Sequence, residues 1–257
     1  MNPSRLILRN TVVVALQQVA LATVLFLLIV GWLHIPDANA LEVLISILLI
    51  LLIAVIGGAG ESAIALRVAG RPIILRGLIP GTVAVIVAAV LWYSISLGVD
   101  HLSAKTVLWA GYLNSRFPSS LRSLFSFEHL FQWSSWLENL VCWGTAGFLT
   151  AAAFVVITRD AFVKGLRAIL WSWRYWLSVL LFAVVGGVLT GKLMGWTPGH
   201  GLRVEAFSLM ARMALVIVLN AATIALLLQA MAHAVVRSHS IGMDEPATSQ
   251  PRTAEMP

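Results

Sequence analysis

A few side chains that can form hydrogen bonds or carry a charge lie inside apolar segments or near their ends. Gln17, Gln18 and Asn220 are amides that lie well inside such segments. An amide in hydrocarbon needs a hydrogen-bond partner, so we expect Asn220 to bond with Gln17 or Gln18 across two helices, at a gain of about 1 kcal/mol. Such a cluster either links the helices or, where a cavity surrounds it, forms a polar transport site. Glu61 and Arg212 lie near the predicted ends of their segments, where a side chain can reach the membrane surface.

Four histidines fall in loops that we place on one side of a membrane, and imidazole nitrogens commonly ligate zinc. Together with Glu128 or Glu138 they would form the centre of a lipid-modifying enzyme if the loops converged. No two of them have the close spacing of paired zinc ligands, and Cys142 is the only cysteine, which excludes a thiolate cage and a disulfide within the chain. We therefore predict no metal and no cofactor. The four histidines are His34, His101, His129 and His200.

Sequence motifs of common enzymes are missing. The chain has no His-Glu-x-x-His helix, no phosphate-binding Walker loop and no Gly-x-Ser-x-Gly nucleophile turn. Gly57-Gly58-Ala59-Gly60 lies inside an apolar stretch with no strand before it, which excludes a dinucleotide-binding turn. The sequence therefore favours a protein without catalytic activity.

The composition predicts lipid as the solvent. Of the 257 residues, 60% are hydrophobic and 11% are charged, and the mean hydropathy is +0.92. A water-soluble fold of this size cannot bury so much apolar surface. The apolar stretches are about 20 residues long and lack a two-residue alternation, so helices rather than barrel strands cross the membrane. The net charge of +6 comes from cations beside these stretches rather than from one basic patch, so we expect no nucleic-acid partner.

Six stretches reach the length that a spanning helix needs. We expect an all-α, polytopic transmembrane helical bundle that forms a single domain over residues 1–236. The polar tail, residues 237–257, lacks an apolar period and is predicted to be disordered. The first stretch has a possible signal-peptide cleavage pattern in Ala38-Asn39-Ala40, but its apolar core is about twice the usual signal length, so we expect a retained span. The predicted spans are 11–33, 41–61, 78–99, 137–157, 173–196 and 207–236.

Cations flank the predicted spans unevenly. Eleven Lys and Arg residues fall on the side of the N-terminus, mostly in short loops, and six fall on the other side. The positive-inside rule then places both termini in the cytoplasm, and we expect the chain in a bacterial inner membrane. The eleven are Arg5, Arg9, Arg67, Arg71, Arg76, Arg159, Lys164, Arg167, Arg174, Arg237 and Arg252.

Two segments outside the spans have the pattern of amphipathic helices. Before the fifth span, Lys164, Arg167 and Arg174 mark one helix face and apolar side chains mark the other. This helix should lie in the cytoplasmic interface, with its cations among anionic lipid headgroups. The long loop before the fourth span is rich in aromatic rings and predicts two interfacial helices, at about 103–113 and 119–136. A lid over a cavity is the alternative for this loop.

Small residues recur at every fourth position in two of the predicted spans. Such ridges let helix backbones approach closely. We expect them to pack the chain's own bundle, or else to form the seam of a homo-oligomer or a contact with another membrane subunit. The ridges are Ala54, Gly58 and Ser62 in the second span and Ala183, Gly187, Gly191 and Gly195 in the fifth.

Three short segments lie in the last third of the chain: Arg174-Tyr175-Trp176-Leu177, Trp196-Thr197-Pro198-Gly199 and Glu205-Ala206-Phe207-Ser208. Together they resemble the C-terminal half of a family of uncharacterised six-helix bacterial membrane proteins. The resemblance implies a six-helix topology. It carries no activity, cofactor or partner over to this chain.

Three functions stay open at this point. The packing ridges and the shortage of buried charge favour a non-catalytic membrane scaffold or an accessory subunit of a larger assembly. The polar set Gln17, Gln18 and Asn220, with glycines in the second span, supports a small transporter or permease instead. A lipid-modifying enzyme would need the loop histidines to converge.

The cation distribution predicts the sidedness of individual loops. A reporter that is active only in the cytoplasm should be active when it is fused within residues 159–167, and inactive when it is fused within residues 103–113. Activity measured in cells carrying each fusion checks this expectation. The opposite pattern of activity would contradict the predicted topology.

Overall fold

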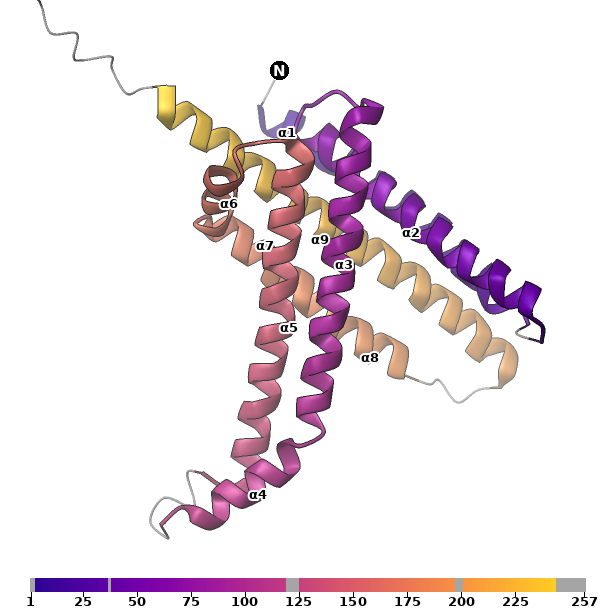
Figure 1. The fold of residues 1–257 in the computed structure, drawn as a ribbon, viewed down its shortest axis with the longest axis vertical. Coiled ribbons are helices and arrows are strands. Elements are labelled where there is room, and N and C mark those ends of the chain that lie inside the picture. Colours follow the sequence, from indigo (N-terminus) through magenta and orange to yellow (C-terminus); the bar gives the residue numbers. More distant parts are fainter. Residues whose placement is uncertain (1–2, 37, 119–124, 197–200, 244–257) are drawn as a thin grey trace, which may run out of the picture.

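The computed structural model of the chain describes residues 3–36, 38–118, 125–196 and 201–243, and within these ranges it contains helices and no strand (Figure 1). The all-α class expected from the sequence is confirmed. The elements are α1 (Pro3–Leu33), α2 (Ala40–Val68), α3 (Leu75–Ser103), α4 (Thr106–Arg116), α5 (Phe127–Thr158), α6 (Phe162–Leu170), α7 (Trp173–Ala183), the π-helix η1 (Val184–Leu189), α8 (Thr190–Gly195) and α9 (Leu202–Met243).

Six helical segments in the described ranges are long and apolar enough to cross a membrane: α1, α2, α3, α5, the continuous α7–η1–α8 segment, and α9. The chain is therefore a multi-pass helical membrane protein. Each segment packs against the next one along the chain, and α9 packs back against α1, which gives a ring in chain order. Within this ring, α3 and α5 run side by side and carry α4 at the end away from α6 (Figure 1).

Several helix boundaries differ from the sequence prediction. α2 continues to Val68, so Glu61 lies about two turns inside the helix rather than at its end. α5 begins at Phe127, where the hydroxyl of Ser126 accepts a hydrogen bond from the amide of His129. The interfacial helix expected over 119–136 is therefore part of a span from Phe127 onward, and residues 119–124 lie outside the described ranges. α9 continues to Met243, so the first residues of the predicted tail are helical.

Glycines of α2 allow a close approach to α1. A Cβ atom built on Gly60 would lie 2.5 Å from the side chain of Leu21, and one built on Gly57 would lie 3.5 Å from Leu25. Leu21 and Leu25 are one turn apart on α1, so they meet glycines that are one turn apart on α2. The glycines at positions 57 and 60, which do not form a dinucleotide-binding turn, thus have a packing role.

The opposite side of α2 packs equally closely against α3. A Cβ atom on Gly58 would lie 3.0 Å from the side chain of Thr82, and Ser62 occupies the space beside Gly81. Ser62 is fully buried, and its hydroxyl has no hydrogen-bond partner among the described residues. Two members of the ridge predicted in the second span therefore lie at the α2–α3 contact, and the third, Ala54, is half-buried.

The buried core lies at the end of the bundle where α1 begins and α9 ends, and α6 packs across this end (Figure 1). Ile169 of α6 is fully buried, and Gly165 lies against Val155 of α5. An ion pair of 3.1 Å between Arg71 and Asp160 links the loop after α2 to the loop after α5. The apolar face of α6 therefore packs against the bundle itself.

The α2–α3 contact predicts how two glycines of one helix respond to the same substitution. Gly81→Ala would place a Cβ atom 2.5 Å from the Ser62 hydroxyl and 3.1 Å from Ile157. We expect it to lower the free energy of unfolding by about 1–3 kcal/mol, as overpacking does. The control is Gly98→Ala on the same helix, where no atom lies within 4 Å. This variant should be neutral or stabilising by up to about 1 kcal/mol, because alanine favours a helix over glycine. Equal unfolding temperatures of the two variants in detergent would contradict the packing.

Candidate functional site

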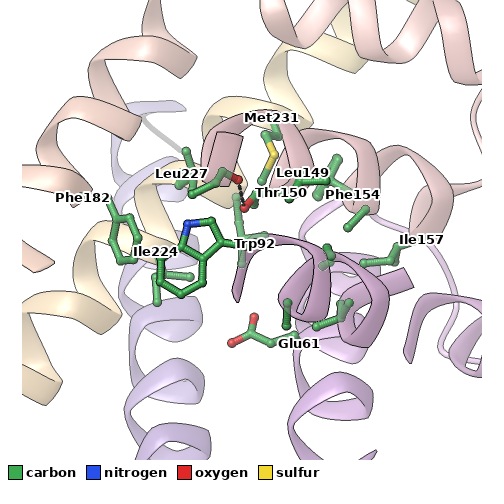
Figure 2. A pocket seen from close by; sticks show the side chains of 17 residues that line it. Glu61, Trp92, Leu149, Thr150, Phe154, Ile157, Phe182, Ile224, Leu227 and Met231 are labelled. Carbon is green, nitrogen blue, oxygen red and sulfur yellow. Dashed lines mark hydrogen bonds between the residues drawn. The ribbon is translucent and has the colours of Figure 1, made fainter. Parts of the chain in front are cut away.

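A partly open cavity of about 350 Å³ lies between α2, α3, α5, α7 and α9, and Ala89 and Trp92 of its wall are exposed. Its wall consists mainly of aliphatic side chains and the aromatic rings of Trp92, Phe154 and Phe182 (Figure 2). A volume of this size is within the range of pockets that hold small molecules. Glu61 is the single ionisable side chain among the described residues that line the cavity.

Glu61 receives a hydrogen bond from α1. Nε2 of Gln18 donates to Oε2 of Glu61 over 2.8 Å, and Gln18 is only 3% exposed. In the unfolded chain the amide of Gln18 bonds to water. If it were buried without this acceptor, those hydrogen bonds would not be replaced and the folded state would be destabilised. Gln18 therefore orients the carboxylate at the cavity wall and also links α1 to α2.

Other polar groups of the wall are already satisfied by backbone carbonyls. The hydroxyl of Thr150 donates to the carbonyl oxygen of Ala146 over 2.7 Å within α5. Nε1 of Trp92 donates to the carbonyl oxygen of Cys142 over 3.1 Å, which joins α3 to α5. A carboxylate offers about four lone-pair sites, and in the described ranges Gln18 uses one of them. Glu61 is thus the ionisable wall group with acceptor capacity left for a ligand, and the hydroxyl oxygen of Thr150 is a weaker, neutral acceptor.

Asn220 does not bond with either glutamine, so the expected amide pair is wrong. Its Nδ2 donates to the carbonyl oxygen of Val216 over 2.9 Å and to the hydroxyl of Thr190 over 3.3 Å. Asn220 therefore faces the α7–η1–α8 segment, whereas Gln18 faces α2. Oε1 of Gln17 is buried without a hydrogen-bond partner in the described part of the chain.

The fifth span does not present one continuous ridge of small residues. Val184–Leu189 form a π-helix, which has more residues per turn than an α-helix, so a four-residue spacing no longer stays on one face. A Cβ atom built on Gly187 would lie 3.1 Å from Trp143 of α5. A Cβ atom built on Gly191 or Gly195 would meet no described atom of another segment within 4 Å. The ridge expected at Ala183, Gly187, Gly191 and Gly195 is therefore interrupted.

The cations expected at the membrane surface are exposed. Lys164 points away from the core, and the guanidinium groups of Arg167 and Arg174 lie 5.7 Å and 5.9 Å from the ring centres of Trp171 and Trp173. Trp171 is 81% exposed. Cations paired with exposed indole rings suit the headgroup region of a bilayer.

The loop histidines do not assemble with other ligands in the described ranges, where no three His, Cys, Asp or Glu side chains lie close enough to hold a metal ion. Glu138 instead accepts a hydrogen bond from Thr106, which ties α4 to α5, and another from Ser134 within α5. Nδ1 of His34, in the turn after α1, lies 2.7 Å from the carbonyl oxygen of Val30 in that helix. His200 lies outside the described residues.

Glu61 is the candidate that the sequence prediction missed. The predicted second span ended at Glu61 because a carboxylate is costly in lipid and commonly marks a boundary. Ile64, Ala65 and Leu66 continue the apolar stretch, however, and Arg67 is the first cation after it. That continuing stretch is the signal that could have placed Glu61 inside the membrane.

Comparisons with known proteins add no relative to these observations. No protein-family model, curated protein or solved structure matches this chain. The cavity and its residues are therefore the basis for proposing a function.

The Gln18–Glu61 hydrogen bond predicts a coupling between these two positions. In a double-mutant cycle of Gln18→Leu and Glu61→Leu, the free energies of unfolding should deviate from additivity by about 1 kcal/mol. Thermal unfolding in detergent measures the four proteins. A cycle of Gln17→Leu with Glu61→Leu is the matched control and should be additive, because Gln17 makes no hydrogen bond to Glu61. Additivity in both cycles would contradict the geometry of this pair.

Proposed function

We propose that this multi-pass membrane protein is a small permease that binds its substrate in the cavity beside Glu61. The observation that carries the proposal is the cavity itself, about 350 Å³ between five helices, with one ionisable group in its wall. An ionisable side chain inside a membrane is costly, and its retention favours a binding or transport role. In this proposal Glu61 and Gln18 take the place of the polar set Gln17, Gln18 and Asn220.

The carboxylate of Glu61 in the cavity wall favours a permease over a scaffold, because a scaffold needs no ionisable side chain inside the membrane. The close contacts of α2 serve the chain's own bundle, so they give no separate support to a partner. Gly191 and Gly195 of α8 stay uncovered within the described chain and are the positions at which a second copy or another subunit would find a small-residue surface. A homo-oligomer is compatible with a permease.

We propose a bacterial inner membrane as the location, with both termini in the cytoplasm. The supporting facts are the excess of Lys and Arg on one side and the common position of the start of α1, the end of α9 and α6 at one end of the bundle (Figure 1). Lys164, Arg167 and Arg174 would then meet anionic lipid headgroups. Membership in the six-helix bacterial family belongs to the same proposal.

A large side chain that fills the cavity should abolish transport by the protein. Ala88 lines the cavity from α3, and the neighbouring Val87 is exposed on the surface of the same helix. Cells that produce the wild-type chain should differ from empty-vector cells in the accumulation of at least one compound from a panel of small organic molecules. Ala88→Phe should remove that difference because its ring occupies the binding space, and the matched control Val87→Phe should keep it. Mass spectrometry of cell extracts measures accumulation.

Two results would count against a permease. One is an unchanged panel, with no compound that depends on the wild-type chain. The other is equal behaviour of Ala88→Phe and Val87→Phe at equal protein levels. If purification in mild detergent also recovered the chain with a stable partner, the scaffold or accessory subunit would become the better function.

A further inference from the structure

We propose that the cavity selects organic molecules with an apolar body and a single positive charge, and that the carboxylate of Glu61 is their counter-ion. This inference rests on the proposed function, since it names the substrate class of the same cavity. It follows from three features: the charges of the wall, the aromatic rings that line the same cavity as the carboxylate, and the lack of other free hydrogen-bond donors among the described lining residues.

No cationic side chain among the described lining residues accompanies the carboxylate of Glu61. Of the described residues that line the cavity from α3, α5, α7 and α9, none is charged or titratable. The contact from α1 is the neutral amide of Gln18. The other titratable groups of these helices, such as Tyr175 and His233, lie outside the lining. An ionised carboxylate in apolar surroundings is stable only with a partner of opposite charge, and here a ligand can supply it.

The aromatic rings of the wall favour the same kind of ligand. Trp92 of α3 and Phe182 of α7 line the cavity together with Glu61 (Figure 2). The face of an indole or phenyl ring attracts a cation within about 6 Å of its centre. A quaternary ammonium group cannot donate a hydrogen bond, so ring faces and a carboxylate are the groups that recognise it best.

The remaining wall disfavours polar ligands. The hydroxyl of Thr150 and Nε1 of Trp92 both donate to backbone carbonyls. Apart from Glu61, the other described lining residues are aliphatic or aromatic. A sugar or a nucleotide would leave several of its polar groups without partners, at a large cost in binding. An anion would meet the carboxylate with like charge. An apolar cation satisfies both the wall and Glu61.

Two probes of equal shape separate charge recognition from simple filling of the cavity. Benzyltrimethylammonium carries a permanent charge, and neopentylbenzene is its neutral isostere with carbon in place of nitrogen. Each is measured by equilibrium dialysis against the full chain in nanodiscs of zwitterionic lipid, with empty nanodiscs to correct for partition into lipid. Glu61→Gln removes the charge but keeps an oxygen acceptor for Gln18. Glu42→Gln on the same helix, at an uninvolved carboxylate, is the matched control.

We expect the wild type and Glu42→Gln to bind the cation equally, and Glu61→Gln to bind it about 30-fold more weakly, as expected when one charge of a buried pair is lost. Neopentylbenzene should bind all three proteins with similar affinity, which also shows that the Glu61→Gln cavity is intact. Equal affinity of the cation for the wild type and Glu61→Gln, with neopentylbenzene still bound, would overturn the inference and leave the permease proposal standing. Failure of the cation to bind the wild type would also overturn the inference, and the accumulation panel tests the permease separately.

Discussion

Close contact of α2 with both α1 and α3 is the constraint on which the rest of the structure depends. Apolar side chains gain little by leaving lipid for a helix interface, so spans associate where small residues let their backbones approach. Gly57 and Gly60 supply this contact toward α1, and Gly58 and Ser62 supply it toward α3. Glu61 lies within this stretch, so a helix that packs closely on two sides also carries a carboxylate into the bundle.

Small residues of α3 and α5 leave space unfilled, whereas those of α2 bring helices into contact. α5 meets α7 where the hydroxyl of Tyr175 donates to the carbonyl oxygen of Gly147, and where the rings of Trp143 and Phe182 lie edge to face. Between these contacts and α2, the wall of α3 and α5 carries alanines, whose side chains are too short to fill the space, so a cavity remains. These alanines are Ala88, Ala89, Ala146 and Ala153.

The six spans could be predicted from the sequence because lipid alone sets their length and composition. The prediction failed where a boundary depends on surroundings: Glu61 ended the predicted second span, although Gln18 of α1 gives it a partner and α2 continues. The partner of Asn220 depends on which helices are neighbours, and a pattern along one chain does not contain that information. The π-helix over Val184–Leu189 breaks a spacing that holds only in a regular α-helix.

The central claim is that Glu61 lies in an apolar cavity inside the membrane rather than at its surface, and selective chemical labelling tests it most directly. An apolar carbodiimide, dicyclohexylcarbodiimide, partitions into lipid and apolar cavities, whereas a charged water-soluble carbodiimide reaches carboxyl groups in contact with water. After treatment of the protein in nanodiscs, mass spectrometry should find Glu61 labelled by the apolar reagent alone, and the exposed Glu205 labelled by the water-soluble reagent. Labelling of Glu61 by the water-soluble reagent to the same extent as Glu205 would contradict the account.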